Sequence, residues 1–202
     1  MSGTVRTWRC DAPPVDRREI LRYAGVRGDA PEVERALEIC LAELLDRLSY
    51  RVCFTECPVA VEGNEVALGQ LRIVSRDLSH RLKGCEGAIL FAATVGNEPD
   101  RLIARYNRLA PSRALLIQAI GSERAEALCD AFNEEMNRVQ EERGNQTRVR
   151  YSPGYGDLSL ETQRDLFLLL DCQRKIGLTL NESLLMSPTK SVTAIIGLEP
   201  QK

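Results

Sequence analysis

The chain has 202 residues, of which 44% are hydrophobic and 28% are charged, and its formal net charge is −2. This composition is typical of a globular protein and excludes a disordered chain or a collagen-like fibre. The near-even balance of 27 basic and 29 acidic residues argues against a nucleic-acid partner, which requires a strongly basic surface. No apolar run approaches the roughly 20 residues of a membrane span, so we expect no membrane association.

The cysteines are seven in number and scattered along the chain. An odd, scattered set favours reduced thiols over a disulfide framework, and residues 1–16 lack the apolar segment of a secretory signal. Both observations predict a cytoplasmic protein. Cys53 and Cys57 lie four residues apart in a segment with strand character, and no histidine is near them in the sequence. We therefore expect core cysteines and no metal site.

The first half of the chain carries signals for helices and then for strands. We expect residues 1–15 to be loosely ordered, because Pro13 and Pro14 prevent a regular helix there. Asp16 is a typical helix cap. From Tyr50 onward, the helical spacing of apolar residues gives way to an alternating pattern that is rich in β-branched and aromatic residues. The predicted elements are helices over residues 17–24 and 31–49, a hairpin of 50–61 with 65–74, a helix over 75–82 and a buried strand over 87–95.

The second half is dominated by helical spacing, with Gly121 expected to weaken the longest helix near its middle. The predicted elements are helices over residues 99–109 and 112–143, a strand over 148–151, a helix over 160–171, and strands over 178–186 and 191–198 joined by a turn. We interpret the charged residues of the long helix as a solvated face: Glu123, Arg124, Glu126, Asp130, Glu134, Glu135, Arg138 and Glu141. Residues 1–202 are thus predicted to form one α+β domain, with helices packed on a mainly antiparallel curved sheet.

Residues for conventional catalysis are few. The single histidine, His80, lies in a polar helical segment and is expected to be a solvated surface residue. The loop 150–157 is more suggestive, because Arg150 can grip a carboxylate and Tyr155 offers an aromatic face. Gly154 would let the backbone approach a ligand closely. From residue types alone, the loop is as consistent with a tight turn whose tyrosines pack as with a binding site for a small zwitterion.

Three motifs follow one another in the last third of the chain. They are Arg150-Tyr-Ser-Pro-Gly-Tyr155, Ile176-Gly-Leu-Thr-Leu-Asn-Glu-Ser183 and Ser187-Pro-Thr-Lys-Ser-Val-Thr-Ala-Ile-Ile-Gly197. In this order they resemble the activation domain of cobalamin-dependent methionine synthase, and the match is clearest over residues 148–198. The whole chain resembles the small stand-alone relatives of that domain.

The resemblance implies a binding site for S-adenosylmethionine. In the family, the arginine of this loop and the backbone after it hold the methionine portion of the cofactor, which maps to Arg150, Ser152, Gly154 and Tyr155. Glu126, on the long helix, corresponds to an acidic residue near the ligand. A sulfonium would favour an aromatic face such as that of Tyr155.

The resemblance also implies a function. The family reactivates oxidised cob(II)alamin by adding one electron and a methyl group from S-adenosylmethionine. We therefore predict a stand-alone reactivation subunit that acts on a cobalamin-binding methionine synthase or related corrinoid protein, with a flavodoxin-like or other electron donor. The nucleophile is the partner's cobalt, so this chain needs no catalytic residue and contributes by positioning the methyl donor.

Two other functions compete with this one. The first is a docking protein for a corrinoid protein that does not use S-adenosylmethionine. It is motivated by Gly144, which stands where the family carries an acidic residue, and by a family tyrosine that falls beyond Lys202. The second is a general S-adenosylmethionine-dependent methyltransferase, which ranks lowest because the chain lacks the glycine-rich strand–loop–helix start of such enzymes.

Overall fold

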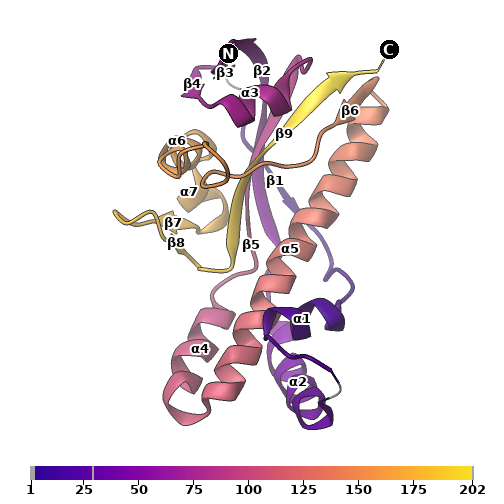
Figure 1. Ribbon diagram of the computed structural model, residues 1–202, viewed down its shortest axis with the longest axis vertical. Helices are drawn as coiled ribbons and strands as arrows, with labels where there is room; N and C mark the ends of the chain where they lie inside the picture. The colour runs from indigo at the N-terminus through magenta and orange to yellow at the C-terminus, as the bar shows by residue number, and fades with distance from the viewer. Residues whose placement is uncertain (1–2, 29, 202) are drawn as a thin grey trace.

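The computed structural model describes residues 3–28 and 30–201. Its centre is an antiparallel seven-stranded sheet with the order β4-β3-β2-β5-β9-β6, and β1 pairs with β2 beside this path (Figure 1). The strands are β1 (Arg6–Arg9), β2 (Arg51–Glu62), β3 (Glu65–Leu68), β4 (Leu71–Val74), β5 (Gly87–Thr94), β6 (Asn145–Thr147) and β9 (Ser191–Pro200). A separate small hairpin joins β7 (Thr179–Leu180) to β8 (Met186–Ser187). The predicted α+β class with a mainly antiparallel sheet is confirmed.

The helices are α1 (Arg17–Tyr23), α2 (Pro31–Leu44), α3 (Arg76–Leu82), α4 (Glu98–Leu109), α5 (Pro111–Glu141), α6 (Thr162–Leu170) and α7 (Cys172–Ile176), with a 3-10 turn at Leu45–Arg47. The longest, α5, has 31 residues and runs beside the sheet and down between α4 on one side and α1 and α2 on the other (Figure 1). Among the described residues, no helix combines the length and the apolar character needed to cross a membrane.

Side-chain alternation on the central strands creates two cores, one on each face of the sheet. Cys53 and Cys57 of β2 face the cluster covered by α3, α6 and α7, and both are buried as predicted. Phe54 and Phe91 face the other way, where their rings lie 5.2 and 4.9 Å from the ring of Phe132 on α5. The second half of α5 is thus fixed against the sheet.

A third core forms beyond the edge of the sheet, where the first half of α5 packs against the other helices. Ile20 of α1, Leu41 of α2 and Leu102 of α4 are buried in it together with Ile117 of α5. Asp16 caps α1 as predicted, accepting hydrogen bonds from the backbone of Arg18 and Glu19. This cluster sets α1 alongside the middle of α5.

The N-terminal segment is more ordered than the sequence predicts. Residues 6–9, within the stretch expected to be loose, form β1, because they complete the hydrogen bonds of β2 at residues 51–54. Met1 and Ser2 lie outside the described residues. The second strand of the predicted hairpin is interrupted at Gly69, whose φ of +60° turns the chain into β4.

The predicted strand over residues 178–186 is wrong, because only Thr179–Leu180 and Met186–Ser187 are strands there and they pair with each other. The predicted strand over residues 191–198 is found as β9, which pairs with β5 from Ser191 to Leu198. Its apolar run, Val192 to Leu198, is almost entirely buried, which suits a central strand covered on both faces. The predicted strand over residues 148–151 is also displaced, to β6, with a single isolated bridge between Tyr151 and Ile195 further on.

Candidate functional site

The segment after β6 changes its register against β9. Thr147 lies opposite Leu198 and Tyr151 lies opposite Ile195, so this segment advances four residues while β9 advances three. One extra residue is characteristic of a β-bulge, and it reverses the side on which the following side chains point. The bulge explains why Arg148 and Arg150 reach different parts of the molecule.

Arg150 extends to α5, where two carboxylates hold it. Its Nη2 lies 2.7 Å from Oε2 of Glu126, and its Nη1 lies 2.6 Å from Oδ1 of Asp130. Burial opposes the charged form of Arg150, but the hydrogen bonds to Asp130 and Glu126 outweigh that effect, so the pKa of Arg150 is raised above its ordinary value. Only 20% of the side chain is exposed. The guanidinium is therefore fixed and permanently charged.

Glu126 and Asp130 also line a groove of about 460 Å³ between α5 and the segment from Pro13 to Tyr23. We call it the acidic groove. Its carboxylates come from Asp16, Glu19, Glu123, Glu126, Asp130 and Glu134. Tyr23 of α1 also lines it, and the pKa of Tyr23 is raised by burial and by the neighbouring Glu126 and Glu19.

The prediction for two charged residues of α5 beside this groove is wrong. Glu123 and Arg124 were expected on a solvated face, yet they are 3% and 0% exposed and form a buried ion pair. Arg124 donates from Nη1 and Nη2 to the carbonyl oxygens of Pro13 and Pro14 at 2.5 and 2.6 Å, and Glu123 accepts from the backbone of Asp16 at 3.0 Å. The pair is buried because the N-terminal segment crosses α5 here and needs partners for its backbone.

The loop after Arg150 is a tight turn on the surface. Gly154 has a φ of +90°, and its N–H donates to the carbonyl oxygen of Leu158 at 2.8 Å. The hydroxyl of Tyr151 donates to the backbone oxygen of Tyr155 at 2.8 Å, which braces the turn from beneath. Ser152 is half-buried, whereas the Tyr155 side chain is 66% exposed. A protruding aromatic ring on a braced turn is suited to contact a ligand or a partner.

The structure brings together two of the five residues predicted for the site, Arg150 and Glu126. Of the five, only Glu126 lines the acidic groove; Arg150 touches it through Glu126 and Asp130, and Ser152, Gly154 and Tyr155 follow Arg150 in the same loop outside the groove. Asp130, the second partner of Arg150, was assigned only to the solvated face. Its spacing of four residues from Glu126 on one helix was the available signal, because such residues share a face.

This arrangement suits a ligand that carries more positive than negative charge. The carboxylates of the acidic groove can hold cationic groups, and the adjacent guanidinium can hold one carboxylate when it exchanges Glu126 or Asp130 for the ligand. The described lining of the groove offers carboxylates and the hydroxyl of Tyr23, and it contains no histidine, cysteine or serine. The arrangement is suited to binding and orienting a cationic ligand.

The fold has a solved counterpart. A structure described as the crystal structure of the MetH reactivation domain bound to AdoHcy matches with a TM-score of 0.68 and 17% sequence identity, over 99% of this chain and 80% of that chain. At this identity the likeness establishes the architecture, that of a reactivation domain. The model of the family "Vitamin B12 dependent methionine synthase, activation domain" matches residues 80–202, and the chain belongs to this family. Both Glu126 and the loop of Arg150 lie within the matched residues.

Proposed function

We propose that this protein is a stand-alone reactivation subunit that binds S-adenosylmethionine and supports reductive methylation of the cob(II)alamin held by a methionine synthase or related corrinoid partner. The observation that carries the proposal is the contact of Arg150 with Glu126 and Asp130, two carboxylates that line the acidic groove, within the residues matched by the family. Membership of the activation-domain family supports the reactivation role.

The charges of S-adenosylmethionine match this site. The ligand has an ammonium, a sulfonium and one carboxylate, so its net charge is positive at neutral pH. The ammonium and the sulfonium would favour the carboxylates of the groove, and the carboxylate would favour Arg150. The exposed ring of Tyr155 adds a face on which a cationic sulfonium can rest. Gly154 and Ser152 would offer backbone groups to the same ligand.

Positioning is what this chain would contribute to the reaction. The partner's cobalamin supplies the nucleophile, and a flavodoxin-like or other donor supplies the electron. The residues of this chain would hold the methyl donor with its sulfonium turned outward, toward a docked partner. Catalysis by such placement needs rigid supports, which the buried face of α5 and the braced turn at Tyr151 provide.

Calorimetric titration tests the cofactor. We expect S-adenosylmethionine to bind more tightly than S-adenosylhomocysteine, because the latter has lost the sulfonium charge that the acidic groove favours. Arg150→Ala should weaken S-adenosylmethionine binding by about 1.5–3 kcal/mol, the range for a hydrogen bond to a charged group. Arg138→Ala is the matched control, since Arg138 also lies between two carboxylates, Glu135 and Glu142, but on an exposed part of α5. Equal affinity of the parent and Arg150→Ala would overturn the assignment.

A docking protein that does not use the cofactor remains the second candidate. One observation favours it: the guanidinium of Arg150 already has two carboxylate partners in the chain itself. In that case a corrinoid protein would be retained equally with and without S-adenosylmethionine, and equally by Arg150→Ala. Loss of retention in Arg150→Ala would argue against it.

We also propose that residues 1–202 act as one domain in the cytoplasm. The seven cysteines are free thiols, which supports a reducing compartment. Contacts of α5 with both the sheet and the helices α1, α2 and α4 support a single cooperative unit. Calorimetric unfolding with one transition would agree with this, and two separated transitions would contradict it.

A further inference from the structure

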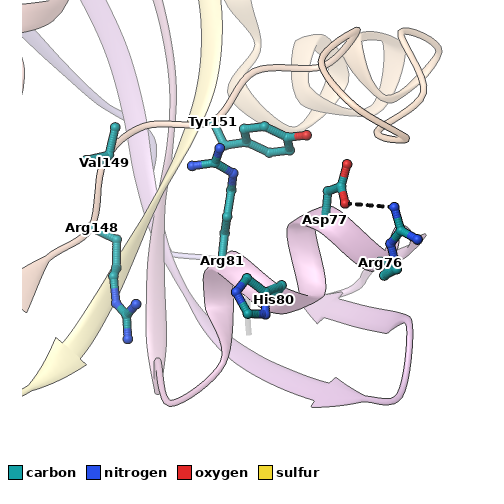
Figure 2. Close-up of a pocket in the computed structure, with 7 residues that line it drawn as sticks. All are labelled: Arg76, Asp77, His80, Arg81, Arg148, Val149 and Tyr151. Carbon is teal, nitrogen blue, oxygen red and sulfur yellow. Dashed lines mark hydrogen bonds and ion pairs between the residues drawn. The ribbon is translucent and has the colours of Figure 1, made fainter.

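A second cavity lies away from the acidic groove, between α3 and the segment 148–151. Its volume is about 740 Å³, within the range of small-molecule sites. Its charged walls come from Arg76, Asp77, His80 and Arg81 on α3 and from Arg148 on the facing segment (Figure 2). We call this cavity the basic pocket, because three guanidiniums and one imidazole meet a single carboxylate there.

The guanidinium of Arg81 is held in place without being neutralised. It lies over the ring of Tyr151, 4.3 Å from the ring centroid, as Figure 2 shows. Stacking uses the flat face of the guanidinium and leaves its N–H edge free. Among the residues that the structure describes, Arg81 and the exposed His80 have no carboxylate within ion-pair distance. The pocket therefore retains the unpaired positive charge of Arg81.

The remaining charges are only partly balanced. Arg76 lies 3.4 Å from Asp77, and its side chain is 76% exposed. Arg148 forms an ion pair of 2.7 Å with Glu199 of β9, yet its Nε is buried without a hydrogen-bond partner. Because that Nε is buried, only the exposed part of the Arg148 side chain is available to a ligand. These features favour an anion with several acceptor oxygens.

We propose that the basic pocket is a second ligand site that binds a phosphorylated small molecule, separate from the site of Arg150. Phosphate fits better than a single carboxylate because its oxygens can accept from several guanidiniums at once, from Arg81 on one wall and Arg148 on the other. The volume accommodates a group of nucleotide size. This inference goes beyond the proposed function, since S-adenosylmethionine carries no phosphate.

Calorimetric titration of the full chain with pyrophosphate and with ADP tests the site, with adenosine as the uncharged comparison. We expect saturable binding of one pyrophosphate or ADP per chain, and no binding of adenosine. Arg81→Gln should weaken the affinity about tenfold or more. Arg101→Gln, which removes an arginine from the surface of α4, should leave it unchanged. Arg81→Gln should also leave S-adenosylmethionine binding intact, which separates this test from that of the proposed function.

Two further measurements keep the proposal falsifiable. If Arg81→Gln fails to fold, Arg76→Gln replaces it, because the exposed Arg76 side chain is dispensable for packing. No binding of pyrophosphate or ADP by the parent at millimolar concentration would overturn the proposal. So would equal binding by the parent and the pocket variants. Binding of a polyglutamate peptide without binding of pyrophosphate would identify a docking surface for an acidic protein and would likewise overturn it.

Discussion

The acidic groove and the basic pocket are opposite in charge, yet one short segment of chain serves both. Arg150 of this segment reaches the carboxylates of α5, while Arg148 and Tyr151 face α3 and β9. The bulge between Thr147 and Tyr151 separates the two arginines. One extra residue in this segment thus places two arginines in different environments, Arg150 beside the carboxylates of α5 and Arg148 beside Glu199 of β9.

The two regions also differ in how their charges are satisfied. In the acidic groove, Glu123, Glu126 and Asp130 already have arginine partners within the chain. In the basic pocket, Arg81 rests on an aromatic ring and has no carboxylate partner among the described residues. Paired charges serve mainly to fix structure, whereas unpaired ones raise the attraction for a ligand. The comparison predicts different consequences for substitutions on the two sides.

The largest effect is expected on the acidic side, at the buried ion pair. Arg124→Met leaves Glu123 charged and without its partner inside the protein, so unfolding should become easier by about 3–5 kcal/mol. Urea denaturation followed by circular dichroism measures the change. The double variant Glu123→Gln with Arg124→Met is the control, and it should be more stable than Arg124→Met alone. A single variant as stable as the parent would show that the pair is not needed to hold residues 13–16.

A smaller effect is expected on the basic side, at Gly156. Its φ is +54°, and a Cβ there would collide with the carboxylate of Asp77 and lie 2.5 Å from the hydroxyl of Tyr151. Gly144→Ala is the control, because Gly144 has a φ of +74° but open space around it. Gly144→Ala should cost about 1–2 kcal/mol of backbone strain. Gly156→Ala should cost a further ~1–3 kcal/mol from overpacking, measured by the same denaturation. Equal losses of stability in Gly156→Ala and Gly144→Ala would show that the turn at Gly156 accommodates a Cβ without overpacking.

The smallest effect concerns Asp157, which joins the loop to the start of α3. Its carboxylate accepts from the hydroxyl of Ser75 and from the backbone of Arg76 and Asp77, at 2.9 and 3.1 Å for the backbone pair. The hydrogen bond from Ser75 is the main cause that lowers the pKa of Asp157. A lowered pKa means that the contribution to stability is present above the unfolded-state pKa and is lost as the pH falls through the folded-state value.

Asp157→Asn should therefore lower the thermal midpoint slightly at neutral pH and less at strongly acid pH, where the parent has lost the same charge. Thermal scans at a series of pH values make the comparison. A constant difference between the two proteins at every pH would refute the role of the carboxylate charge.

Local sequence signals were sufficient for most helices. The caps at Asp16 and Ser75 mark the starts of α1 and α3, and both accept the hydrogen bonds expected of a cap. Local signals did not identify the partners of the strands. For example, β9 pairs with β5, which lies about a hundred residues earlier in the chain, and not with the strand that precedes it. Strand pairing depends on which faces are buried in the finished fold, and that information is not local.

The candidate site also has one part that the sequence predicted and another that only the structure revealed. The residues of the loop from Arg150 to Tyr155 and the membership of the activation-domain family follow from the order of motifs in the chain. The contact of Arg150 with Asp130, the burial of Glu123 and Arg124, and the basic pocket emerge only in three dimensions. The physical reason is that a bulge changes the direction of a side chain without any distinctive residue type, and that burial of a charge depends on what crosses over it.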